Sequence, residues 1–244
     1  MKRVAIVQAR MTSVRLPGKV LMDIEGRPML DRVVDRVRRC EELDEIVVAT
    51  TINQEDDPIV ERCKGLDVRW HRGSELDVLG RYVEAAEITK ADLVVRFTAD
   101  CPLIDPGVAD SVMRAASASA SLCDYASNTV ERTFPRGLDT EALFADVLMR
   151  TARLASSVPA REHVTWFIHQ ERPDLFIRRD VVDGVDNSDL RWTVDTADDL
   201  ALVREMYARL NLDEQDVSLA KLVDVVRTDP RLLGLNAHVR QKEI

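Results

Sequence analysis

The chain has 244 residues, of which 45% are hydrophobic and 32% are charged, so its composition is that of a folded protein with a sizeable core. Acidic residues number 43 against 34 lysines and arginines, and the resulting net charge of −9 argues against general nucleic-acid binding. No apolar run approaches the ~20 residues of a membrane span, and the N-terminal apolar stretch is shorter than a signal-peptide core, so we expect a cytoplasmic protein. Reduced thiols, rather than a disulfide frame or zinc site, are expected from four scattered cysteines without a CxxC pair, Cys40, Cys63, Cys101 and Cys123.

The first half of the chain alternates short apolar runs with amphipathic segments. The β-branched apolar runs predict buried strands at 3–9, 45–51, 67–71 and 92–100. Hydrophobic residues at helical spacing predict helices at 29–40, 56–66, 76–89 and 107–119. Strands and helices in this order imply right-handed crossovers and a mainly parallel sheet, so we expect one α/β domain over residues 1–244.

The alternation breaks in the middle of the chain. Residues 128–190 combine two possible strands, 139–144 and 175–182, with a helix around 142–170. We interpret them as an inserted α+β segment, for acceptor binding or dimerisation, on the parallel-sheet core. The alternation returns at 190–210, where a strand is predicted to run into a helix, and a final helix and a tail follow.

A basic segment, "ARMTSVRLPGK" (9–19), contrasts with the acidic chain, because it holds Arg10, Arg15 and Lys19 and no acid. It directly follows the first predicted strand, at the carboxyl end where open α/β sheets bind ligands. The Pro-Gly pair allows a tight turn, and the Ser13 hydroxyl and backbone amides can face an anion. Three cations suit a triphosphate, although the P-loop pattern is absent and a solvated basic loop is an open alternative.

Two carboxylates follow apolar runs that we interpret as strands. Asp100 ends "VVRFTAD" and Asp195 ends "LRWTVD". A pair of carboxylates at a sheet edge can bind Mg²⁺ and leave coordination sites for phosphates. The alternatives are a turn-forming role for Asp100 and, after Asp195, helix capping by Thr196 and Asp199. Together with the basic segment, the two acids suggest a nucleoside triphosphate with magnesium.

A resemblance to a known family begins with "VQARMTSVRLPGKVLMDIEGRPMLDRVVDRV". This run resembles the opening of sugar-acid cytidylyltransferases, most closely the SpsF-type branch of spore coat polysaccharide biosynthesis. The 3-deoxy-manno-octulosonate and acylneuraminate cytidylyltransferases share the pattern more loosely. The resemblance continues to residue 210 through "EIVVATT", "RGSELDVLGRYVEAA", "RFTADCPLIDP", "REHVT" and "TVDTADDL".

The resemblance implies a Rossmann-like, GT-A-like nucleotidyltransferase fold and a homodimer. It also implies a reaction in surface polysaccharide or glycan biosynthesis. In that reaction, a Mg²⁺-dependent enzyme transfers CMP from CTP to a sugar acid of the 2-keto-3-deoxy type and releases pyrophosphate. No nucleic-acid or membrane partner is implied.

By this resemblance, the two acids Asp100 and Asp195 would bind magnesium, and Arg81 in segment 74–81 would lie near the nucleotide. The sugar pocket would come from the middle segment, which includes Glu162 and His163. The CTP phosphates would be held by Arg10, Ser13, Arg15 and Lys19. Transfer itself would depend on the cations Arg15 and Lys19 and on both acids.

The chain also departs from the family pattern. Thr98 stands where the octulosonate enzymes carry a glutamine that contacts the base, and "RGSELDVLGR" replaces their "HQSGTER" pattern. Strict cytosine preference and the acceptor therefore stay open. Three alternatives follow: a nucleotidyltransferase for a non-acid sugar, phospho-alcohol or phosphonate, a glycosyltransferase on the same fold, and a non-catalytic nucleotide-binding protein.

Overall fold

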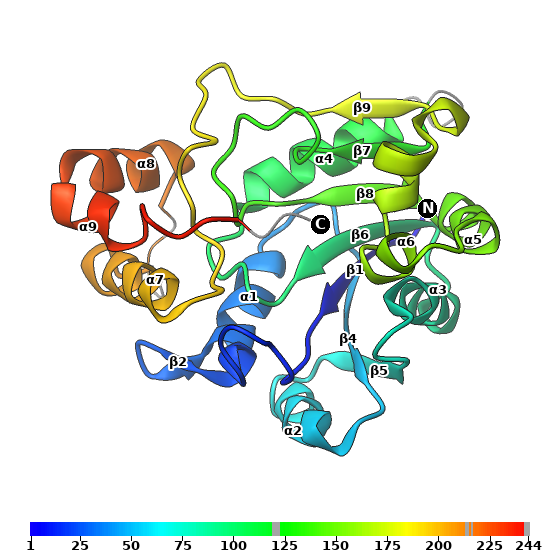
Figure 1. The fold of residues 1–244 in the computed structure, drawn as a ribbon, viewed down its shortest axis with the longest axis horizontal. Helices are drawn as coiled ribbons and strands as arrows, with labels where there is room; N and C mark the ends of the chain where they lie inside the picture. Colours follow the sequence, from blue (N-terminus) through cyan, green and yellow to red (C-terminus); the bar gives the residue numbers. More distant parts are fainter. Residues whose placement is uncertain (119–122, 213–214, 216, 242–244) are drawn as a thin grey trace.

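The computed structural model describes residues 1–118, 123–212, 215 and 217–241 (Figure 1). Within this part, one seven-stranded sheet comprises β1 (Arg3–Gln8), β4 (Glu45–Thr51), β5 (Arg69–Gly73), β6 (Leu93–Thr98), β7 (Tyr125–Ser127), β8 (Glu141–Phe144) and β9 (Arg178–Asp180). The strand order is β5-β4-β1-β6-β8-β7-β9. A separate small hairpin pairs β2 (Asp23–Ile24) with β3 (Arg27–Pro28).

The sheet is mainly parallel, as the strand–helix rhythm predicted. Strand β1 pairs in parallel with β4 and β6, and β4 pairs in parallel with β5. Only β8 reverses direction within the described sheet, pairing antiparallel with both β6 and β7. The mainly parallel α/β architecture expected from the sequence is therefore confirmed.

The helices cover both faces of this sheet (Figure 1). Alternate residues of β1 face opposite sides, because side chains in a strand alternate, so Ala5 and Val7 pack in one cluster and Val4 and Ile6 in another. The Ala5 face is covered by α1 (Met29–Val37), α2 (Asp57–Gly65) and α4 (Pro106–Ser117). The Val4 face is covered by α3 (Val78–Thr89), α5 (Ala145–Leu154) and α6 (Val158–Glu162).

The C-terminal helices form a third layer around the fully buried Trp192. They are α7 (Ala197–Leu210), α8 (Leu219–Thr228) and α9 (Pro230–Leu235), which lie together at one side of the molecule (Figure 1). Part of the final predicted helix and tail, residues 213–214, 216 and 242–244, lies outside the described residues, as does residue 119 of the predicted 107–119 helix. No helix in the described part combines the length and apolarity needed to cross a bilayer.

The middle of the chain differs from the prediction. The single helix expected around 142–170 is wrong, because this stretch contains the end of β8, helices α5 and α6, and a π-helical turn at Phe167–Glu171. Ser157 starts α6 separately, since its Oγ accepts a hydrogen bond from the Ala160 amide at 3.1 Å and Pro159 occupies the first turn. The two strands expected in this segment do form, as β8 and β9, and both join the central sheet.

The strand predicted before Asp195 is also wrong. Residues 190–194 form only an isolated bridge, between Arg191 and Arg136, because the amides of the run bond to two different segments. The Trp192 amide donates to the Arg136 carbonyl at 2.6 Å, and the Val194 amide donates to the Asp100 carbonyl at 2.8 Å. Asp195 therefore follows an extended run held between the middle segment and the end of β6.

A glycine makes this packing possible. Gly137 has a φ of +104°, and a Cβ at this position would lie 2.5 Å from the Thr193 amide nitrogen. We expect Gly137→Ala to lower the free energy of unfolding by about 2 kcal/mol or more, because left-handed strain adds to a backbone clash. Thermal or urea denaturation measures the loss. Gly184→Ala, where nothing lies within 4 Å of the added Cβ, is the matched control and is expected to leave stability almost unchanged.

Candidate active site

The basic loop is closed at its base and attached to the 3₁₀ turn Gln54–Asp56, which follows β4. The Met11 carbonyl accepts hydrogen bonds from the Ser13 and Gly18 amides at 2.9 and 2.8 Å. The Met11 amide donates to Oδ1 of the fully buried Asp56 at 2.7 Å. Gly18 has a φ of +72° and turns the chain into a short 3₁₀ segment that begins at Lys19. These contacts direct Lys19 into the protein rather than into solvent.

Lys19 joins the two predicted acids. Its Nζ donates to Oδ2 of Asp100 at 2.7 Å, to Oδ1 of Asp195 at 2.9 Å and to the Val194 carbonyl at 2.8 Å. The residue is only 7% exposed, so all three ammonium hydrogens are used inside the protein. The structure thus brings together three residues that the sequence predicted to share a site.

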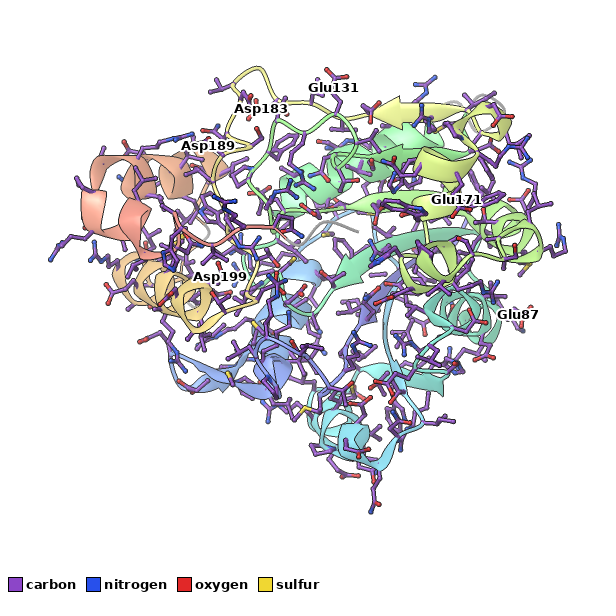
Figure 2. All side chains as sticks on the ribbon, viewed as in Figure 1. Glu87, Glu131, Glu171, Asp183, Asp189 and Asp199 are labelled. Atoms are coloured by element: carbon purple, nitrogen blue, oxygen red, sulfur yellow. The ribbon has the colours of Figure 1, made fainter. Side chains whose placement is uncertain are left out.

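The second oxygen of Asp195 binds two arginines. Arg15 Nη2 lies 2.8 Å and Arg191 Nη2 lies 2.6 Å from Oδ2 of Asp195. Arg191 Nε also donates to Oδ1 of Asp199 at 3.0 Å, and Asp199, labelled in Figure 2, lies in the first turn of α7. The capping box predicted for Thr196 and Asp199 is present, and Asp195 has a separate role within the ion cluster. Sequence analysis missed Arg191, whose only signal was its position in the same "LRWTVD" run.

The surrounding charges keep both Lys19 and Asp100 ionised. Burial lowers the pKa of the Lys19 ammonium, but Asp100 and Asp195 outweigh it, so the pKa is raised. Burial likewise raises the pKa of Asp100, but the charge of Lys19 and the Thr98 hydroxyl, at 2.6 Å from Oδ1, bring it below its ordinary value. Asp100 therefore stays a carboxylate at neutral pH, which suits a cation ligand better than a general acid.

The donor set fits a magnesium ion. In the described part of the chain no group of three or more His, Cys, Asp or Glu side chains could hold a metal. Mg²⁺ commonly takes only one or two protein carboxylates and completes its shell with phosphate oxygens and water. Asp100 and Asp195, which reach the same Lys19 nitrogen from segments 95 residues apart in the sequence, provide such a pair.

Two other predicted residues line one cavity. Arg10 and Glu162 both border a cavity of about 390 Å³ between the 74–77 loop and α6. Arg10 Nη1 lies 3.8 Å from Oε1 of Glu75, which also accepts a hydrogen bond from the Thr12 hydroxyl at 2.7 Å. The cavity therefore lies between the basic loop and the middle segment. The sequence analysis assigned the basic loop to CTP and the middle segment to the acceptor sugar.

Three further candidates do not line this cavity. Arg81 is 2% exposed, and its Nη1 donates to the Ser74 carbonyl at 3.0 Å, so it holds the loop that borders the cavity. Ser13 is half-buried within the basic loop. His163 lies at the end of α6, with its ring centroid 6.2 Å from that of Trp166.

The comparison with known proteins identifies the family. A model described as cytidylyltransferase matches residues 4–216. The chain belongs to the cytidylyltransferase family. It is therefore a nucleotidyltransferase enzyme, as the opening run predicted, and the alternative of a non-catalytic protein is set aside.

Curated relatives support this assignment over most of the chain. The chain is 34% identical over 244 residues to an uncharacterized protein from Methanocaldococcus jannaschii, covering 99% of this chain and 97% of that one. It is 32% identical over 233 residues to the spore coat polysaccharide biosynthesis protein SpsF of Bacillus subtilis, covering 92% and 94%. The 3-deoxy-manno-octulosonate cytidylyltransferase of Geobacter sulfurreducens matches a shorter part, 37% identical over 111 residues, 45% of this chain and 43% of that one.

Solved structures share the fold. A cytidylyltransferase from Leptospira borgpetersenii superposes over the full length of both chains with a TM-score of 0.90 and 27% identity. A CMP:2-keto-3-deoxy-manno-octonic acid synthetase in complex with CTP covers 86% of this chain and all of that one, with a TM-score of 0.66 and 20% identity. At 20% identity, the second likeness supports the fold alone.

Proposed function

We propose that this cytidylyltransferase transfers CMP from CTP to a sugar acid of the 2-keto-3-deoxy type, with Mg²⁺, and releases pyrophosphate. The observation that carries the proposal is the bonding of one buried ammonium, Lys19, to both Asp100 and Asp195 beside a basic loop. The similarity to a 3-deoxy-manno-octulosonate cytidylyltransferase favours a sugar acid as acceptor.

In the proposed reaction an acceptor hydroxyl oxygen attacks the α-phosphorus of CTP, the bond to the β-phosphate oxygen breaks, and the hydroxyl proton is lost. Magnesium on Asp100 and Asp195 would neutralise charge on the phosphate oxygens. Arg15 and Lys19 would offset the charge that develops on pyrophosphate, because preorganised cations stabilise it without reorganisation. Arg10 and Ser13 would orient the phosphates from the start of the same loop.

The remaining predicted residues take supporting roles in this proposal. Arg81 would hold the 74–77 loop near the nucleotide, since its guanidinium already bonds to that loop. Glu162 and His163 would contact the acceptor from the end of α6. We also propose a cytoplasmic homodimer acting in surface polysaccharide biosynthesis; the four cysteines, all free and buried, fit a reducing compartment.

Metal removal and nucleotide exchange test this proposal. We expect pyrophosphate release with CTP and 3-deoxy-manno-octulosonate or a related 2-keto sugar acid. A chelator is expected to lower the rate by at least 100-fold, and added Mg²⁺ to restore it, because the phosphate charge is otherwise uncompensated. The coupled pyrophosphate assay is run in parallel with UTP, ATP and GTP, and with a neutral sugar, a phospho-alcohol and a phosphonate as acceptors.

The metal arm and the acceptor arm each have a result that would contradict the proposal. Turnover that persists at the same rate in chelator refutes the metal role of Asp100 and Asp195. Turnover with neutral sugars but with no sugar acid refutes the acceptor class and favours the broader nucleotidyltransferase alternative.

A further inference from the structure

Arg136 lies within electrostatic reach of two other arginines, Arg132 and Arg191, and the three differ in their ion-pair partners. Arg132 forms a double hydrogen bond with Asp139, at 2.6 and 2.9 Å. Arg191 is bound by Asp195 and Asp199. Arg136 lies between them in the "TFPRGLD" turn and is half-buried, yet its guanidinium has no hydrogen bond or ion pair with any residue that the structure describes.

The backbone of Arg136 belongs to the active-site framework. Its amide donates to the Leu190 carbonyl at 2.9 Å, and its carbonyl accepts from the Trp192 amide. Two residues further along the same extended run, Val194 bonds to Asp100 with its amide and to Lys19 with its carbonyl. Two residues of extended chain span ~7 Å, so Arg136 is fixed on the same side of the molecule as the proposed phosphate site.

Among the residues that the structure describes, no carboxylate is paired with the Arg136 guanidinium. Its pKa is lowered by burial and then by the like charge of Arg132, while Asp139 raises it and Arg191 lowers it. Asp139 is already engaged by both nitrogens of Arg132, and the acids beside Arg191 are engaged by that residue. The same Arg132–Asp139 pair acts electrostatically on Cys101, the neighbour of Asp100, so these groups border the site.

Nearby loop acids do not supply the counter-ion. Figure 2 shows Glu131, Asp183 and Asp189 on the loops at the edge of the molecule. Asp189 is ion-paired with Arg227 at 2.6 Å. None of the Arg136 nitrogens is among the fully buried unpaired atoms of the described residues, so the guanidinium is open to an external anion.

We propose that Arg136 is a specificity-determining residue that binds the anionic group of the acceptor, a carboxylate or a phosphate monoester. The guanidinium fork matches either group with two parallel hydrogen bonds. Placed on the middle segment and not on the basic loop, it recognises the acceptor independently of the CTP phosphates. This inference rests on the proposed function, and it adds a residue that lies outside Glu162 and His163.

The test compares Arg136→Gln with Arg153→Gln, a matched loss of charge at an exposed position on α5. With 3-deoxy-manno-octulosonate as acceptor, Arg136→Gln is expected to raise the acceptor KM about 10–100-fold, which is typical of losing a charge-assisted hydrogen-bond pair. The KM for CTP is expected to stay within twofold. For an acceptor whose carboxylate is reduced to an alcohol, we expect wild-type protein and Arg136→Gln to have the same acceptor KM.

A binding arm separates this inference from the reaction itself. Wild-type protein, saturated with Mg²⁺ and a non-hydrolysable CTP analogue, is titrated by calorimetry with octulosonate and, separately, with inorganic phosphate. Failure of the analogue to bind would refute the proposed function. Tighter binding of octulosonate than of phosphate assigns a carboxylate site, and the reverse assigns a phosphate site. The affinity for whichever anion binds more tightly is expected to fall at least 10-fold in Arg136→Gln, because a charge-assisted hydrogen-bond pair is lost. The affinity is expected to stay unchanged in Arg153→Gln.

The proposal is overturned by either of two outcomes. One is an acceptor KM and anion affinity in folded Arg136→Gln that match those of Arg153→Gln. The other is a rise in the CTP KM equal to the rise for the acceptor, which would assign Arg136 to the nucleotide. Circular dichroism and thermal melting confirm that the variant is folded, and Arg136→Lys, which keeps the charge without the fork, is expected to recover part of the affinity.

Discussion

Asp100→Asn is expected to lower pyrophosphate release by about 10²–10³-fold, the range typical of removing one electrostatic contact to a transition state. The substitution keeps the shape of the side chain and removes one of the two charges that can hold a divalent ion. It leaves Lys19 bonded to Asp195 and the Val194 carbonyl, so the protein is expected to fold. Single-turnover kinetics with CTP, together with circular dichroism, measure both effects.

The control for this variant is Asp198→Asn, which removes an exposed carboxylate two residues after Thr196 and is expected to turn over like wild-type protein. A folded Asp100→Asn enzyme within tenfold of the wild-type rate would show that Asp100 does not hold the catalytic metal. Direct Mn²⁺ binding in the presence of a CTP analogue is expected to weaken in Asp100→Asn alone.

Lys19→Met is expected to lose a similar 10²–10³-fold in rate, but for a different reason. Methionine has nearly the length of the lysine stem and no charge, so the phosphates lose a cation while both carboxylates remain. Mn²⁺ binding measured without nucleotide is therefore expected to be at least as tight as in wild-type protein, because no ammonium competes for Asp100 and Asp195. Pyrophosphate release measures the rate, and titration with Mn²⁺ measures the metal affinity.

Lys221→Met provides the control, since Lys221 is exposed on α8 and, among the described residues, forms an ion pair with Asp224 alone. A loss of metal binding in folded Lys19→Met would mean that the lysine organises the acids rather than the phosphates. Together, the Asp100 and Lys19 variants separate metal ligation from phosphate stabilisation.

Local patterns predicted the parallel half of the fold well and the middle of the chain poorly. Strands 3–9, 45–51 and 92–100 are apolar enough to be buried on both faces, so their type is determined by their own residues. Residues 190–194 have the same apolar character, yet their amides bond to Arg136 and Asp100, and no strand forms. The single helix predicted around 142–170 does not form, because a serine cap and a proline begin α6 as a separate helix. Hydrophobic spacing alone does not reveal this boundary.

By itself, the sequence determined which residue types were present for the chemistry: a basic loop after the first strand, and acids at 100 and 195. Their composition and order predicted a site for a triphosphate and a divalent ion. Only the tertiary structure decided that Lys19 bonds both acids, that Arg191 shares Asp195, and that Arg136 has no counter-ion among the described residues. Lys19 and Asp195 are 176 positions apart. A contact of that kind depends on how the sheet, the middle segment and α7 pack together, and no local pattern encodes it.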